Sequence, residues 1–260
     1  MTRRVAVALM LCGGAAIDSA RADGDVAALV RDLRGVDVGV AVDAAHRLGE
    51  DASPRALDAI LDELSIGAPP RVQAALLADL ATRPDPRAVP VLALYAHNRS
   101  PELRKKAIVD LSTIADPRVA PLLVAALSDD VHDVRAAAAR GLAKRKEASA
   151  LEPLVRLLER ADNAAPDALA AVATPDIARR LAELINHVPA ALLAQTLGGM
   201  LHRADFGPDP IRVDVVETLA KIPGADATAE LKDYVTLTAA AQSLPSRVAA
   251  MKRLKDRGGG

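Results

Sequence analysis

The chain has 260 residues; 51% are hydrophobic but only 1% are aromatic, and the formal net charge is −1 at pH 7. This balanced charge and the scarcity of stacking rings argue against nucleic-acid binding, which needs a basic surface and commonly uses aromatic platforms. Because Cys12 is the single cysteine, an internal disulfide framework and a cysteine-based metal site are excluded.

Residues 1–22 have the features of a secretory signal peptide. A basic start is followed by an apolar run over 5–16, and Ala20-Arg21-Ala22 gives a small-x-small cleavage pattern. The apolar run is too short to span a bilayer. We therefore expect cleavage near Ala22, export to the periplasm or out of the cell, and no integral membrane span.

Cys12 leaves a lipid anchor open as an alternative. A lipobox places a small residue directly before the modified cysteine, whereas Leu11 stands there in this sequence. A tethered envelope lipoprotein is therefore the alternative to a freely exported protein, and the two differ in whether Cys12 is acylated.

One pattern occurs twice over residues 85–142, with a spacing of 31 residues. Asp-Pro-Arg stands at 85–87 and again at 116–118, and the pattern of aliphatic residues behind it repeats as well. A period between 20 and 50 residues is typical of proteins built from stacked repeats. The same spacing extends outward through one leucine series, Leu61, Leu92, Leu123 and Leu154.

Each copy of the pattern predicts two short helices joined by a turn. Asp85 and the proline after it suit a helix start, since aspartate accepts bonds from free N–H groups and proline lacks a donor. After a break at 98–101, Leu103, Ala107 and Leu111 follow at helical spacing. Such a pair cannot bury its apolar faces alone, but stacked pairs can. The predicted fold is all-α: an α-solenoid (superhelix) of about seven stacked helix-turn-helix repeats.

Helical periodicity and breaking residues divide the rest of the chain in the same way. We expect residues 23–257 to form one continuous solenoid, 258–260 to be a flexible tail, and no strands to occur. The glycines at 198 and 199 are expected to weaken their helix locally. Outside the two central copies, the predicted helices are 25–33, 37–48, 54–64, 70–81, 150–160, 166–173, 174–186, 189–203, 211–222, 225–238 and 245–255.

Two motifs in the repeats resemble those of a known family. Asp-Pro-Arg-x-x-Pro-x-Leu opens the first helices, and Asp-Val-Arg-x-Ala-Ala-Ala-x-x-Leu stands in a second helix at 133–142. Both resemble HEAT repeats, especially the short repeats of bilin-lyase-type HEAT proteins. The resemblance covers residues 25–257 and is sharpest over 54–160.

The resemblance also implies a ladder of ion pairs along the stack. In that family an aspartate in the turn between two helices pairs with an arginine six residues later. Asp129 and Arg135 fit this pattern, and Asn98 with Arg104 fits half of it. Because Gly67 is followed by a glutamine at the corresponding position, we expect the ladder to be interrupted there.

The sequence lacks the catalytic patterns that we sought. No two of its five histidines have the i, i+4 spacing of metal ligands on one helix face, and no nucleophile elbow or phosphate-binding loop occurs. His132 stands beside three aspartates, which lack the spacing of a calcium loop and are interpreted as a solvated helix start. We therefore expect no metal, no cofactor and no enzymatic activity; a lyase-like HEAT-repeat enzyme is the alternative that the resemblance implies.

What remains is a surface for binding. The resemblance implies that the second helices line the concave side of the stack, where a charged groove would bind a protein or an extended peptide. The function expected is a non-catalytic scaffold or adaptor of the bacterial cell envelope. Arg104 and Arg135 are open to a second interpretation, in which they are buried in the ladder. The candidate binding residues are Arg71, Arg104, Lys105, Asp110, His132, Arg135 and Arg140.

Overall fold

The structure is a computed structural model that describes residues 25–258. The expected signal peptide and residues 259–260 of the expected tail lie outside this range. Between residues 25 and 258 the chain contains only helices, turns and connecting segments, without a strand. This confirms the predicted all-α class.

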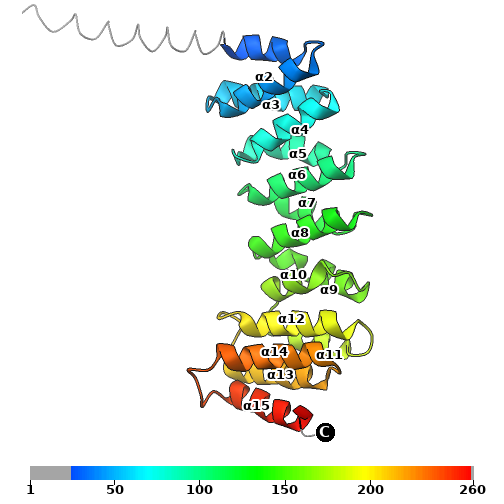
Figure 1. Ribbon diagram of the computed structural model, residues 1–260, viewed down its shortest axis with the longest axis vertical. Coiled ribbons are helices and arrows are strands. Elements are labelled where there is room, and N and C mark those ends of the chain that lie inside the picture. The colour runs from blue at the N-terminus through cyan, green and yellow to red at the C-terminus, as the bar shows by residue number, and fades with distance from the viewer. Residues whose placement is uncertain (1–24, 259–260) are drawn as a thin grey trace, which may run out of the picture. The chain divides into compact units, whose positions relative to one another are not determined.

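Short helices follow one another along the described chain, and successive helices are joined by turns or by loops such as the one before α15 (Figure 1). The first covers residues 25–33. The others are α2 Val38–Glu50, α3 Pro54–Ile66, α4 Pro70–Leu80, η1 Pro86–Ala88, α5 Val89–Tyr95, α6 Pro101–Thr113, α7 Val119–Ala126, α8 His132–Lys144, η2 Ala148–Ala150, α9 Leu151–Glu159, α10 Ala165–Val172, α11 Ile177–Glu183, α12 Ala190–His202, α13 Asp209–Lys221, α14 Ala225–Leu237 and α15 Pro245–Gly258.

The chain divides into two compact units, 1–115 and 116–260, which we call the N-terminal and C-terminal units. In the N-terminal unit α2 packs on α4 and α4 packs on α6, so the second helices of successive hairpins form one row. In the C-terminal unit α8, α10, α12 and α14 form such a row, and α11, α13 and α15 pack in order beside it. In the N-terminal unit α3 packs on α5 as the second row. Each unit therefore has the two-row construction of an α-solenoid, while the single continuous solenoid stays a prediction.

The leucine series that revealed the repeat lies in the core of each unit. Leu92, Leu123 and Leu154 are at most 1% exposed, and Leu61 is 9% exposed. Each buried leucine stabilises the fold by on the order of 2 kcal/mol relative to an exposed one. In stacked repeats such burial is shared between neighbouring repeats, which stabilise one another.

The Asp-Pro-Arg tripeptides begin the first helices as expected, with one addition. Asp85 accepts a hydrogen bond from the backbone N–H of Arg87, and Asp116 accepts one from Arg118, each at 2.8 Å. Each arginine also folds back onto the aspartate two residues before it. The Arg118 side chain and N–H together lower the pKa of Asp116 to about 2. The tripeptide thus forms a closed turn, and the α-helices begin just after it.

Glycines permit close approach between second helices, and Gly49 and Gly198 are two examples. A Cβ added to Gly49 of α2 would lie 2.5 Å from the Cβ of Asp79 on α4. A Cβ on Gly198 of α12 would lie 2.9 Å from the Cγ of Glu230 on α14, and closer still to its carboxylate. α12 continues without interruption through Gly198, so this glycine gives room to a neighbouring side chain inside a regular helix.

Replacing Gly49 by alanine is expected to lower the free energy of unfolding by about 2 kcal/mol, since the added methyl group overlaps a side-chain atom next to the α4 backbone. Urea denaturation measures the change. Gly258→Ala is the matched control, because its Cβ would have no atom within 4 Å. Equal stability of Gly49→Ala and the parent would show that α2 and α4 do not pack this closely.

Candidate protein-binding surface

The candidate residues of the N-terminal unit differ in exposure. Arg71 is exposed on α4, whereas Arg104 and Lys105 on α6 are half-buried. Arg104 donates from Nη1 to the backbone carbonyl of Asn98 at 3.0 Å, which fixes its head against the turn before α6. Arg71 is therefore the candidate of this unit whose side chain is most open to a partner.

Asp110 does not lie on an exposed surface. It is 2% exposed, and neither carboxylate oxygen accepts a hydrogen bond. The nearest cation is the ammonium of Lys106, 4.0 Å from Oδ2. Burial raises the pKa of Asp110 to about 6, with Lys106 acting in the opposite direction. This corrects the expectation that Asp110 is available to a partner.

A second carboxylate of the same row was missed by the sequence analysis. Asp79 lies 31 residues before Asp110, at the equivalent position of α4. His46 on α2 places Nδ1 3.4 Å from its Oδ2, and the two side chains are 52% and 18% exposed. Burial raises the pKa of Asp79, and His46 opposes the shift. The 31-residue spacing of the two aspartates was the available signal.

In the C-terminal unit, His132 and Arg135 meet at one carboxylate. Arg135 donates from Nε to Oδ2 of Asp162 at 2.6 Å, and Nδ1 of His132 lies 3.2 Å from Oδ1. Burial acts to raise the pKa of Asp162, but the N–H of Ala164 and the Arg135 guanidinium hold this pKa below its usual value. A cavity of about 400 Å³ adjoins this group, lined by His132, Arg135, Arg160, Ala161, Asp162, Asn163 and Leu192.

Arg135, which the resemblance places in the ladder, also reaches beyond its own repeat. Arg135 reaches the residue six positions earlier, but it donates to the backbone carbonyl of Asp129, at 2.7 Å. Its carboxylate partner, Asp162, belongs to the following turn. The arginine therefore joins two successive turns of the stack. Arg140, the remaining candidate, is exposed on α8.

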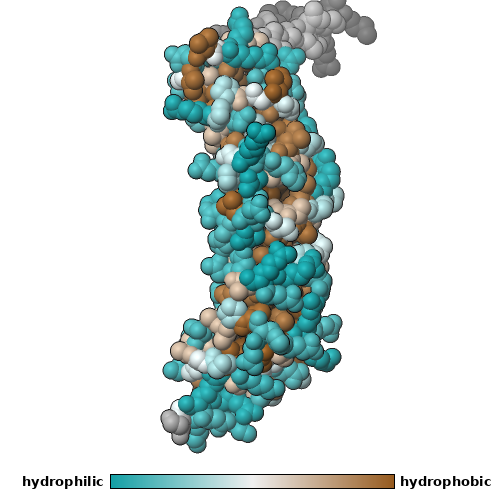
Figure 2. Space-filling view, turned by 90° about the vertical axis from the view of Figure 1, so that its right-hand side faces the viewer, coloured by the Kyte–Doolittle hydropathy of each residue, from teal (hydrophilic) through white to brown (hydrophobic). Residues whose placement is uncertain are grey.

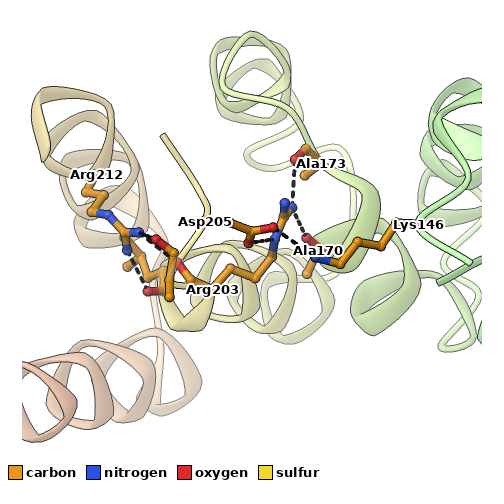
Figure 3. A network of polar contacts seen from close by, with 8 residues as sticks. Lys146, Ala170, Ala173, Arg203, Asp205 and Arg212 are labelled. Atoms are coloured by element: carbon orange, nitrogen blue, oxygen red, sulfur yellow. Dashed lines mark hydrogen bonds and ion pairs between the residues drawn. The ribbon is translucent and has the colours of Figure 1, made fainter. Parts of the chain in front are cut away.

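A polar network fixes the edge where α10 and α12 end (Figure 3). Arg203 donates from Nη1 to the carbonyls of Ala170 and Ala173, at 2.9 and 2.7 Å. Its Nε donates to Asp205 at 3.0 Å, and Asp205 also binds Lys146 at 2.9 Å. Both cations lower the pKa of Asp205, and Arg203 has the larger effect. The network satisfies carbonyls that a helix end leaves without partners.

Arginine side chains also donate to backbone carbonyls at other helix ends, and the sequence analysis missed these contacts. Arg83 donates to the carbonyl of Asp51 just after α2, at 2.6 Å. Arg145 donates to Asp116 at 3.1 Å, and Arg257 donates to Ala220 at 2.8 Å. Arg83 and Arg145 are two repeat lengths apart, and this spacing was the sequence signal for these contacts.

The surface is mostly polar on the face that Figure 2 shows, where hydrophobic residues appear in small separate areas. Among the described residues, no group of three or more His, Cys, Asp or Glu side chains is arranged to hold a metal ion. Within the same range, no helix is long and apolar enough to cross a bilayer. The exposed parts of the described units therefore offer many polar contacts.

Comparison with known proteins identifies the repeats. Residues 57–139 match the family model for HEAT repeats. Residues 134–160 match the PBS lyase HEAT-like repeat. Over residues 57–160 these matches confirm the resemblance drawn from the Asp-Pro-Arg and Asp-Val-Arg motifs. HEAT repeats as a class bind proteins through their extended surfaces.

The solved structures that match the chain include the following two. One is the complex of CpcE and CpcF of phycocyanin lyase from Nostoc sp. PCC7120, with 17% identity, 88% of this chain and 92% of that chain covered, and a TM-score of 0.47. The other is an engineered protein, with 22% identity, 94% and 74% covered, and a TM-score of 0.45. None of the curated proteins matches the sequence.

The expectation that the chain is not an enzyme is contradicted. The repeat over 134–160 matches the family model for the PBS lyase HEAT-like repeat, and this repeat includes Arg135 and Arg140 of the candidate surface. The lack of familiar catalytic motifs had suggested a purely structural protein. The absence of those motifs therefore did not justify that expectation.

Proposed function

We propose that the chain is a scaffold of the bacterial cell envelope that binds a protein or an extended peptide through its rows of second helices. The observation that supports this most directly is the packing of successive second helices within each unit, α2 on α4 on α6 and α8 on α10 on α12 on α14. Such packing aligns side chains of several repeats into one surface, which suits a long partner.

The composition favours an interface of many modest contacts. The chain has three aromatic residues in total. Tyr95, Phe206 and Tyr234 are all buried, at 5% exposure or less. Tight interfaces commonly use projecting Trp or Tyr side chains as anchors. This surface instead offers exposed charges such as Arg71 and Arg140, which orient a partner and accelerate its association.

Reversing the charge of Arg140 or Arg71 is expected to weaken partner binding about tenfold without loss of stability, since both side chains are exposed. Residues 23–260 are immobilised, the protein captured from an envelope extract is identified, and its affinity is measured for Arg140→Glu and Arg71→Glu. Arg156→Glu, an exposed change on α9 in the other row, is the control. Equal weakening by all three variants would place the partner elsewhere.

Export is part of the proposal and rests on the sequence of residues 1–22. Intact mass of the protein purified from its native envelope distinguishes the two forms. A mature chain that begins near Asp23 supports a freely exported protein, whereas a chain that begins at an acylated Cys12 supports the tethered one. A full-length mass starting at Met1 would reject both.

A lyase-like activity is the second candidate, and the match of residues 134–160 to the PBS lyase HEAT-like repeat favours it. The chain would then hold a chromophore or its acceptor protein against the α8–α9 region. The assay incubates the full chain with phycocyanin apoprotein and a free bilin, and follows visible absorbance on the denatured apoprotein. Faster covalent attachment than without the chain supports the activity, and an unchanged rate rejects it.

A further inference from the structure

A cavity opens beside the ends of two second helices in the C-terminal unit. Its volume is about 450 Å³, and it lies where α12 and α14 end and α13 begins. The segment 238–244, which leads to α15, forms one side. Its apolar lining residues include Leu201, Ala204, Tyr234, Leu237 and Leu244.

The exposure of the apolar lining residues increases from the bottom of the cavity to its opening. Leu201 and Tyr234 are each 1% exposed, and Leu244 is half-buried. Leu237 is 59% exposed, which is unusual for a leucine on a helix that is otherwise packed on two sides. The cavity thus has a buried apolar floor and an apolar side chain at its entrance, which is the usual construction of a pocket for an apolar group.

The charged groups in the lining are already engaged by the protein. Arg203 and Arg212 donate to backbone carbonyls at the ends of α10 and α12. Asp209 accepts hydrogen bonds from the backbone N–H and the hydroxyl of Ser246, which begin α15. His202 is exposed and acts electrostatically on Glu230. Because Arg203, Arg212 and Asp209 already form hydrogen bonds within the protein, a charged ligand gains few contacts here, and the apolar part of the lining favours a neutral apolar ligand.

The same contacts make the wall rigid. Arg203 lies over the ring of Phe206, with 5.7 Å between the guanidinium carbon and the ring centroid, and Phe206 is 1% exposed. Arg203 and Arg212 together hold the segment between α12 and α13 against both helix ends (Figure 3). A cavity with fixed walls binds its ligand without a large cost of reorganisation.

We propose that this cavity receives one leucine- or phenylalanine-sized side chain of the partner protein. The inference rests on the proposed function and adds the chemistry of its anchor. Since the three aromatic residues of this chain are buried, the anchoring side chain comes from the partner and the pocket from this chain. An apolar protein cavity of about 150 Å³ already admits benzene, so 450 Å³ has room for such a group.

The test uses N-acetyl-leucinamide and N-acetyl-phenylalaninamide as probes of the full chain, with methyl NMR of the leucines as the readout. Both probes are expected to saturate shifts at Leu201, Leu237 and Leu244 at millimolar concentration. The aspartyl and lysyl amides are expected to cause none. Leu237→Asp, which places a charge at the entrance, should weaken probe binding at least tenfold. Leu94→Asp, on a leucine 64% exposed in the other unit, is the matched control.

The proposal is overturned if the two apolar amides cause no shifts, or shifts spread over the whole molecule. It is also overturned if the charged amides cause equal shifts, or if the shifts are unchanged in Leu237→Asp. Thermal unfolding of both aspartate variants separates lost binding from lost folding, and Ala204→Trp, which fills the cavity from an exposed position, gives a second blocked form. The amide experiment needs no partner, so its result stands if pull-down captures nothing. If a partner is captured equally by Leu237→Asp and the parent, the scaffold function survives and the anchor pocket fails.

Discussion

Replacing Arg203 by alanine is expected to lower the free energy of unfolding of the C-terminal unit by about 3 kcal/mol. The guanidinium donates to two helix-end carbonyls and to Asp205, and it covers the ring of Phe206. Its loss leaves the carbonyls of Ala170 and Ala173 without this donor, and both residues are 3% exposed. An unsatisfied buried polar group costs about 1 to 3 kcal/mol.

Urea denaturation of the full chain measures this change, and two variants sharpen it. Arg203→Lys keeps the charge but cannot span both carbonyls and Asp205, so it should recover only part of the loss. Arg180→Ala removes an ion pair with Glu152 whose side chains are 40% and 53% exposed, and it should cost under about 1 kcal/mol. Similar losses for Arg203→Ala and Arg180→Ala would show that the carbonyl contacts do not stabilise the stack.

The positions of most helices could be predicted because repeat spacing and helix periodicity reinforce one another. α14 and α15 begin at the residues expected for them. The helix expected over 174–186 is shorter, Ile177–Glu183. Its start is delayed because Pro175 and Asp176 form a turn, closed by the N–H of Ile177 donating to the carbonyl of Thr174 at 3.1 Å. The turn at Asp116 has the same backbone bond, in which the N–H of Val119 donates to the carbonyl of Asp116 at 3.2 Å, so the repeat pattern already contained the information.

The candidate surface was less predictable, because exposure depends on neighbouring helices. A hydrophilic residue such as Asp110 is normally assigned to the solvent side, and only the packing of its helix shows that it is buried. The arginine contacts at helix ends were missed for a different reason. Arg83 and Arg203 bind backbone carbonyls, which every residue possesses, so their targets leave no mark in the sequence.

The proposed binding surface and the anchor pocket depend on which arginines are exposed and which are hydrogen-bonded within the protein. Arg71 and Arg140 remain available because no neighbouring repeat covers them, whereas Arg135 and Arg203 are used within the protein. Arginine content alone would therefore overstate how basic the available surface is. Charge reversal at the available arginines tests recognition, while substitution at the engaged ones tests the fold.

The buried carboxyl of Asp110 makes stability depend on pH in a predictable direction. Its pKa is raised from 3.8 to about 6 by burial, so the folded state holds this proton more tightly than the unfolded state. The resulting stabilisation is fully present below pH 3.8 and is lost as the pH rises through 6. Each pKa unit corresponds to about 1.4 kcal/mol, so the loss between pH 4 and pH 8 is about 2 to 3 kcal/mol.

Asp110→Asn removes the ionisable group, so the variant lacks this pH-dependent loss. Between pH 4 and pH 8 the free energy of unfolding of the parent should therefore fall by about 2 to 3 kcal/mol relative to that of Asp110→Asn. Asp110→Leu should show the same shift with a different constant offset, because its packing differs but it also cannot ionise. Lys106→Met should enlarge the loss in the parent background, since the ammonium of Lys106 lowers the pKa of Asp110. Urea denaturation at several pH values measures all four proteins. Parallel stability curves for the parent and Asp110→Asn would mean that Asp110 is solvated in both states, and that the row of second helices does not enclose it.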